Sequence, residues 1–188
     1  MEIKGITIKA SDTTEDLRNF RCGVPAMDKF IQEGLQQSIS HHFCQLYKVL
    51  MEEEVVALFA LSFDSINLDD DDKEDIVAGV SSTGTPDLTF DYEDIFYSKR
   101  RYPALDIAYL AVREDLRNKH LGTYIVSQIK KKAKEQNLAG CQFLSVEAYK
   151  MQEHSAVEFY YKCGFAPNEQ PNPCKDTLRM FYTLYSKS

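Results

Sequence analysis

The segment from Asp106 to Lys134 constrains the fold of this chain more than any other stretch. It opens with an apolar strand, Ile107 to Val112, which runs through a short polar turn directly into a helix. Along that helix the apolar and part-apolar side chains recur at the spacing of one helical face, so the segment predicts a helix packed on a sheet. The members of this stripe are Leu121, Tyr124, Ile125, Gln128, Ile129, Lys132 and Ala133.

The turn between this strand and this helix is suited to bind an anion. The first N–H groups of a helix have no partner within the helix, and the helix N-terminus carries partial positive charge. Gly122 lets the backbone approach a ligand closely, and a phosphate is the most natural ligand. The same turn also fits an ordinary strand–helix connection, and it lacks the G-x-G-x-x-G and G-x-x-x-x-G-K-S/T motifs. It comprises Arg117, Asn118, Lys119, His120, Leu121, Gly122 and Thr123.

A second segment, EHSAVEFYYKCGF from Glu153 to Phe165, follows the apolar strand Phe143 to Ala148. Together the two segments resemble the GNAT superfamily of acyl-CoA-dependent N-acyltransferases. The pyrophosphate loop of that family reads Q/R-x-x-G-x-G/A, and here Arg117 to Gly122 occupy its positions. A later helix of the family often reads A-x-x-F-Y-x-x-x-G-F. Its fixed positions are matched by Ala156, Phe159, Tyr160, Gly164 and Phe165.

This resemblance implies an α/β (α+β) fold, with a central mixed, mostly antiparallel sheet that is splayed at the cofactor site and flanked by helices. It implies acetyl-CoA as the acetyl donor, with its pyrophosphate on the amides of Arg117 to Thr123. The pantetheine arm is then expected along the backbone of Leu110, Ala111 and Val112. A primary amine attacks the thioester directly, without a covalent enzyme intermediate, and Tyr160 protonates the departing thiolate as general acid.

One position departs from the family pattern. His120 stands where the pyrophosphate loop usually has its first glycine. If this position needs a positive φ, histidine is tolerated better than a β-branched residue but worse than glycine. Histidine here is therefore expected to weaken cofactor binding relative to the motif, although the backbone donors of the loop remain.

The sequence does not decide which residue removes the proton from the acceptor amine as general base. Glu147, near the end of its strand, is a weak candidate, and Asp106 and His154 are alternatives. Tyr160 also has a simpler interpretation, as a core aromatic on its helix. Positioning the two reactants can contribute about 7–11 kcal/mol in favourable cases.

The N-terminal part is similar to the opening F-x-C-G-x-x-x-L-D-x-F-L of a GNAT branch that includes toxins paired with small DNA-binding antitoxins. Phe20, Cys22, Gly23, Asp28 and Phe30 match it, and Met27 replaces its leucine. The resemblance implies acetylation of the amino acid on charged tRNA. A simpler interpretation is an amphipathic helix that packs on the core, and both can hold because core packing needs no particular substrate. A net charge of −7 speaks against nucleic acid, because nucleic-acid binding usually needs a basic patch.

The basic runs of the chain give this tRNA hypothesis little support. One run is Lys130-Lys131-Lys132 with Lys134, which is expected to be a solvated helix face. The other is Lys99-Arg100-Arg101.

Length and composition fit one domain spanning residues 1–188. No apolar run is long enough for a membrane span, and the start lacks the features of a signal peptide. The 5 cysteines are odd in number and contain no C-x-x-C pair, which favours reduced thiols, as expected in a cytoplasm, over a zinc site. We expect no metal. Dimerisation and acyl-chain length stay open.

Outside the central segment the pattern predicts strands, one long helix and an irregular acidic insertion. The insertion at about 64–104 is interpreted either as a flap over the acceptor or as a mobile acidic loop. Strands are expected at Ile3–Lys9, Gln45–Met51, Val55–Phe63 and Asp176–Tyr185, and a helix at Pro25–Ile39.

Three functions remain open. The first is an N-acetyltransferase that acts on an amine of a small molecule or protein. The second is a toxin-like transferase that acts on aminoacyl-tRNA. The third is a non-catalytic acyl-CoA-binding or interaction module, which weak cofactor binding traceable to His120 would favour.

Overall fold

The computed structural model describes residues 5–78, 90–151, 153–168 and 175–184. Its strands are β1 (Ile6–Ser11), β2 (Gln45–Met51), β3 (Glu54–Asn67), β4 (Arg101–Val112), β5 (Phe143–Met151), β6 (His154–Ser155), β7 (Ala166–Pro167) and β8 (Thr177–Thr183). Its α-helices are α1 (Pro25–Glu33), α2 (Leu35–Ser40), α3 (Asp70–Ala78), α4 (Phe90–Ser98), α5 (Leu121–Glu135) and α6 (Val157–Lys162). Short 3₁₀ turns lie at Glu15–Leu17 and Glu114–Leu116.

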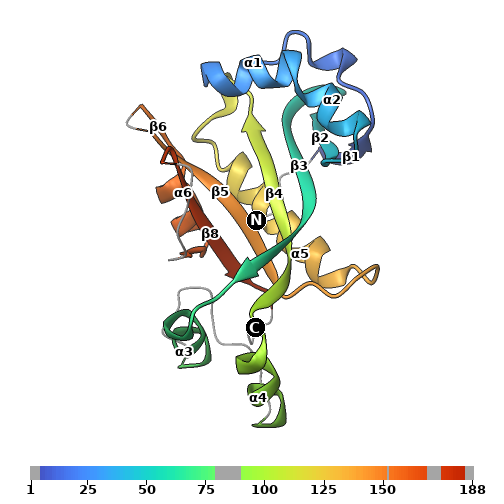
Figure 1. The fold of residues 1–188 in the computed structure, drawn as a ribbon. Helices are drawn as coiled ribbons and strands as arrows, with labels where there is room; N and C mark the ends of the chain where they lie inside the picture. The colour runs from blue at the N-terminus through green and yellow to red at the C-terminus, as the bar shows by residue number, and fades with distance from the viewer. Residues whose placement is uncertain (1–4, 79–89, 152, 169–174, 185–188) are drawn as a thin grey trace. The chain divides into compact units, whose positions relative to one another are not determined.

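Within the described ranges the strands form an 8-stranded sheet in the order β1-β2-β3-β4-β5-β8-β7, with β6 paired to β5 (Figure 1). β4 and β5 are parallel, whereas β2 is antiparallel to β1 and β3, and β8 is antiparallel to β5 and β7. The predicted α/β (α+β) architecture, a mixed and mostly antiparallel sheet flanked by helices, is confirmed. None of the helices in these ranges combines the length and apolar character that a membrane crossing requires.

The chain divides into two compact units. Unit 1 comprises residues 1–62 and 107–128, and unit 2 comprises residues 63–106 and 129–188. β3, β4 and α5 each pass from one unit to the other along the chain. The turn after β4 therefore belongs to unit 1, and the helix α6 belongs to unit 2.

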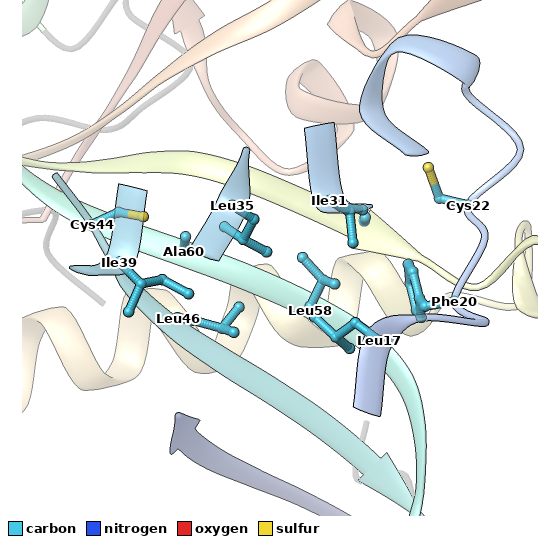
Figure 2. Packing of buried hydrophobic residues seen from close by; sticks show 11 residues of the cluster. Leu17, Phe20, Cys22, Ile31, Leu35, Ile39, Cys44, Leu46, Leu58 and Ala60 are labelled. Carbon is cyan, nitrogen blue, oxygen red and sulfur yellow. The ribbon is translucent and has the colours of Figure 1, made fainter. Parts of the chain in front are cut away.

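The core of unit 1 lies between its helices and strands (Figure 2). α1 and α2 direct Ile31, Leu35 and Ile39 toward Leu46 of β2 and Leu58 of β3. Burying a side chain of this size stabilises a fold by about 1.5–3 kcal/mol. The apolar face predicted for the N-terminal helix is therefore what holds it to the sheet.

The prediction of one helix from Pro25 to Ile39 is wrong, because the structure has two helices separated at Gly34. Gly34 takes φ −113° and ψ −30°, away from regular helical values, and its N–H donates to the carbonyl oxygen of Phe30 at 2.8 Å. A glycine weakens a helix interior because its backbone loses more entropy on ordering. A Cβ at Gly34 would also lie 2.9 Å from the Phe30 ring, so a side chain at this position would require the ring to shift.

The motif at Cys22, Gly23 and Asp28 has a clear structural role in unit 1. The Asp28 carboxylate accepts hydrogen bonds from the backbone N–H of Cys22 at 2.7 Å and of Gly23 at 3.2 Å. Gly23 takes φ +79°, and a Cβ there would lie 2.9 Å from the Glu114 carboxyl group. Phe30 stacks on Tyr109 of β4 with ring centroids 4.3 Å apart. The motif thus anchors the N-terminal segment on the end of β4 and the turn that follows it.

We expect Gly23→Ala to lower the free energy of unfolding by about 1–3 kcal/mol, because alanine is strained at φ +79°, whereas the flexible Glu114 side chain can move away from the added Cβ. Gly140→Ala is the matched control, since a Cβ at Gly140 meets nothing within 4 Å. Denaturant unfolding of both variants measures the difference. Equal stability of the two variants would contradict this account of the motif.

Unit 2 contains two helices in the stretch predicted to be irregular, and that prediction is wrong for the described residues. β3 continues to Asn67, α3 and α4 follow, and β4 begins at Arg101. These helices are held by apolar side chains that join one core: Ile66, Leu68, Ile76, Phe96, Tyr102, Ala104, Phe143, Ala166 and Phe181. The Tyr102 hydroxyl donates to the carbonyl oxygen of Phe96 at the end of α4. The serine-rich part at 81–86 lies outside the described residues.

The other predicted strands are present. Gln45–Met51 is confirmed as β2 with the predicted bounds. Among the described residues, β1 covers Ile6–Ser11 where Ile3–Lys9 was expected, and β8 covers Thr177–Thr183 where Asp176–Tyr185 was expected; the predicted positions 3, 4 and 185 are not tested. Residues 1–4 and 185–188 lie outside the described ranges.

Candidate active site

The predicted anion-binding turn lies in unit 1 between β4 and α5. Arg117, Asn118, Lys119 and His120 are exposed, and Leu121 is buried as the first residue of α5. The His120 carbonyl oxygen accepts the first hydrogen bond of the helix, from the N–H of Tyr124 at 3.0 Å. The N–H groups of Leu121, Gly122 and Thr123 therefore occupy the helix N-terminus, where backbone donors have no intrahelical acceptor.

Two residues of this turn have left-handed backbone conformations. Asn118 takes φ 60° and His120 takes φ 62°. The position at which the motif expects glycine thus does need a positive φ, and histidine occupies it at a conformational cost of about 1–2 kcal/mol.

We expect His120→Gly to raise the free energy of unfolding by up to about 1 kcal/mol, because glycine adopts this φ without steric penalty. Lys119→Gly is the control, since Lys119 is exposed and lies outside the positive-φ set, so glycine adds only chain entropy. Thermal unfolding of both variants distinguishes them. A loss of stability in His120→Gly as large as in Lys119→Gly would contradict the expectation.

The residues predicted to meet the pantetheine arm lie at the end of β4. Ala111 is buried in the core of unit 1, and Leu110 and Val112 are partly buried. The next residue, Arg113, donates its N–H to the carbonyl oxygen of Val56 at 2.9 Å and binds Asp115 through two guanidinium nitrogens, at 2.7 and 3.1 Å. These hydrogen bonds of Arg113 hold the start of the turn in place.

Tyr160 lies on the short helix α6 of unit 2, which packs near β5 (Figure 1). Its ring makes edge contacts with Phe159 and Phe165, at centroid distances of 4.9 and 5.3 Å. Only 5% of the residue is exposed, whereas Tyr161 is 40% exposed. Burial, and then the charge of Asp106, raise the pKa of the Tyr160 phenol above its ordinary value of 10, so the phenol stays protonated at neutral pH.

Lys130 of α5 supports the end of α6. Its ammonium group donates to the Cys163 carbonyl oxygen at the C-cap of α6 and lies 3.4 Å from the Tyr182 ring centroid. Burial lowers the pKa of Lys130 to about 8. The expectation of a solvated basic face is therefore wrong for Lys130, whereas Lys131, Lys132 and Lys134 are exposed. The exposure of Lys132 also removes it from the predicted buried stripe, and Val126 takes part in burial instead.

A group of polar side chains surrounds Asp106 within unit 2. Asp106 faces Ser145 in the β4–β5 register, and the Ser145 hydroxyl lies 3.2 Å from Asp106 Oδ1 and 2.5 Å from Asp64 Oδ2. Arg179 donates to Asp64 at 2.6 Å and to Glu147 at 3.1 Å. Burial, and then the charge of Asp64, raise the pKa of Asp106 from 3.8 to about 7. Asp106 thus titrates near neutral pH.

The other two candidate bases are placed differently. Glu147 is exposed and accepts hydrogen bonds from Arg179 and from the Thr177 hydroxyl at 2.9 Å. His154 lies in β6, where it pairs with Met151. The Glu147 carboxylate is thus already engaged by Arg179 and Thr177.

Sequence reasoning did not single out Asp64, Ser145 or Arg179. One indication of this group was present in the sequence. Ser145 and Glu147 lie two positions apart along β5, so alternation of side chains in a strand places them on the same face. Within the described ranges no group of three or more His, Cys, Asp or Glu side chains is arranged to hold a metal ion.

Comparisons with known proteins agree on one fold. A family model described as the acetyltransferase (GNAT) family matches residues 35–165. A tyrosine-to-phenylalanine mutant of KacT is 16% identical with a TM-score of 0.68, and the match covers 96% of both chains. A mutant AtaT toxin bound to the C-terminus of the antitoxin AtaR and acetyl-CoA is 18% identical with a TM-score of 0.65, over 96% of this chain and 94% of that one.

AtaT complexed with acetyl-methionyl-tRNAfMet is likewise 18% identical with a TM-score of 0.65, over 95% of this chain and 94% of that one. No curated protein gave a significant match to the sequence. At these identities the structural likeness shows the fold.

Proposed function

Because the chain belongs to the acetyltransferase (GNAT) family, we propose that it transfers the acetyl group of acetyl-CoA to a primary amine by direct attack. The observation that carries this proposal is the placement of two proton-carrying groups in unit 2. The Tyr160 phenol is buried on α6, and Asp106 on β4 is hydrogen-bonded by Ser145 and close enough for its charge to raise the pKa of Tyr160. Acid–base catalysis by such groups contributes about 10²–10⁴-fold.

The turn of unit 1 is proposed to bind the donor. The pyrophosphate of acetyl-CoA would accept hydrogen bonds from the amides of Arg117 to Thr123, at the N-terminus of α5. The left-handed backbone at Asn118 and His120 turns the chain at this point, which supports a pocket for an anion. The pantetheine arm would follow the backbone of Leu110, Ala111 and Val112. The structurally similar AtaT mutant was determined with acetyl-CoA bound, which agrees with this choice of donor.

Catalysis then needs two proton transfers. The acceptor ammonium group loses a proton to Asp106, and the neutral amine attacks the acetyl carbonyl to form a C–N bond. The tetrahedral species breaks its C–S bond, and Tyr160 donates a proton to the leaving thiolate. The products are the N-acetylated amine and CoA with a free thiol. The proton held by Asp106 passes to solvent, and Tyr160 is reprotonated. Asp106 replaces Glu147 as the proposed base because Glu147 is ion-paired with Arg179.

For the acceptor we propose the α-amino group of an aminoacyl-tRNA. Two observations support it: the toxin-like fold along nearly the whole chain, and the anchored motif at Cys22, Gly23 and Asp28. The net charge of −7 opposes it, because tRNA binding requires a local basic surface. An amine on a small molecule or protein is the alternative acceptor.

Calorimetric titration with acetyl-CoA tests the donor site. We expect binding by the unmodified protein and its loss in Gly122→Trp, because an indole at the second residue of α5 blocks the helix N-terminus. Gly140→Trp is the matched control, because a Cβ at Gly140 meets nothing within 4 Å. Absence of binding by the unmodified protein would contradict an acetyl-CoA enzyme and favour a non-catalytic module.

A further inference from the structure

The Ser145 hydroxyl lies between two carboxyl groups of unit 2. Ser145 is fully buried, and its Oγ is 2.5 Å from Asp64 Oδ2 and 3.2 Å from Asp106 Oδ1. A hydroxyl has one proton to donate and lone pairs to accept. It can therefore donate to Asp106 when Asp106 is ionised. When Asp106 is protonated, the hydroxyl can accept from Asp106 and donate to Asp64.

Arg179 fixes the other side of this network. Its guanidinium group donates to Asp64 at 2.6 Å, to the Ser65 carbonyl oxygen at 3.3 Å and to Glu147 at 3.1 Å. The side chains of Arg179 and Asp64 are 26% and 24% exposed, so water screens this pair less than a fully exposed one. Arg179 thus holds Asp64 in the position from which it acts on Ser145 and Asp106.

We propose that Asp64, Ser145 and Arg179 are positioning residues that set the pH at which Asp106 takes up a proton. The consequence for catalysis rests on the proposed function, in which Asp106 is the base. The titration of Asp106 itself does not depend on that function, because the network exists in the protein without substrate.

The members of the network act on Asp106 with opposite signs. The negative charges of Asp64 on β3 and Glu147 on β5 favour the protonated form of Asp106. The Ser145 hydroxyl on β5 and the positive charge of Arg179 on β8 favour its ionised form. Tyr160 on α6 is neutral at the same pH and adds no charge. Removing different members must therefore move the titration of Asp106 in different directions.

The test is a carbon-13 NMR titration of the Asp106 carboxyl group in the unliganded protein, with the signal assigned by its loss in Asp106→Asn. We expect Asp64→Asn to lower the Asp106 pKa by about one unit, and Ser145→Ala and Arg179→Gln to raise it by a similar amount. Glu158→Gln removes an exposed carboxylate of α6 and is the control, with no shift expected.

Shifts of the same sign in Asp64→Asn and Arg179→Gln, or no shift in either, would overturn the proposal. This comparison stands even if Ser145→Ala fails to fold. The acid limb of kcat/KM is measured on the same variants. Carboxyl titrations that move as expected while the acid limb stays fixed would support the network and remove Asp106 as the base. Failure of the proposed function is thereby separated from failure of this inference.

Discussion

Replacing Tyr160 by phenylalanine is expected to lower kcat for acetyl transfer by about 10²–10⁴-fold, with little change in KM for acetyl-CoA. The phenol is held in a buried site that keeps it protonated, and the leaving thiolate needs a proton as the C–S bond breaks. Phenylalanine retains the ring contacts with Phe159 and Phe165, so the fold is expected to persist. Steady-state kinetics, with circular dichroism to confirm folding, measures the effect.

Tyr161→Phe is the matched control, because it removes a hydroxyl from the adjacent, more exposed residue. It is expected to keep kcat near the unmodified value. Similar losses in both variants, or full activity in Tyr160→Phe, would contradict the assignment of Tyr160 as general acid.

Asp106→Asn is expected to lower kcat/KM at neutral pH by about 10²–10⁴-fold and to remove the acid limb near pH 7. The amide has nearly the shape of the carboxyl group but accepts no proton at this pH. Glu147→Gln is the control, and it is expected to leave most activity because its carboxylate is already paired with Arg179. Greater loss in Glu147→Gln than in Asp106→Asn would reverse the two roles.

Asp106→Asn is also expected to change how the stability of the protein depends on pH. Folding raises the pKa of Asp106 from 3.8 to about 7, so the folded state favours the protonated carboxyl group. The stabilisation from that protonation is fully present below about pH 4 and is lost as pH rises through about 7. As pH rises from about 4 to about 7, the free energy of unfolding of Asp106→Asn should therefore fall less than that of the unmodified protein. Thermal unfolding between pH 4 and pH 7.5 measures the difference, and parallel curves would contradict it.

The sequence predicted the elements whose pattern is local. β2 and α5 follow from apolar spacing, and the turn before α5 follows from its motif. The conformational demand on His120 was also foreseeable, since glycine at that position of the motif indicates a positive φ. These features depend on residues close together in the chain, so they can be predicted from a single sequence.

The elements that were missed depend on contacts between distant residues. α3 and α4 lie in acidic sequence, and they are held by a few apolar side chains, such as Ile76 and Phe96, that reach a shared core. Ser145 is one polar residue within the apolar strand β5, and its sequence neighbours give it no special role. It gains its importance only because folding brings Asp64 and Asp106 to it, 81 and 39 residues away along the chain.

The measurement that tests the central claim most directly is transfer of labelled acetyl from acetyl-CoA. The acceptors are aminoacyl-tRNA, uncharged tRNA and simple primary amines, each assayed with the unmodified protein and with Tyr160→Phe. The account predicts labelled product on aminoacyl-tRNA, none on uncharged tRNA, and a large loss in the variant. Label on simple amines alone would retain the acetyltransferase and replace the tRNA acceptor. Absence of transfer to every amine, by a protein that binds acetyl-CoA, would contradict the account.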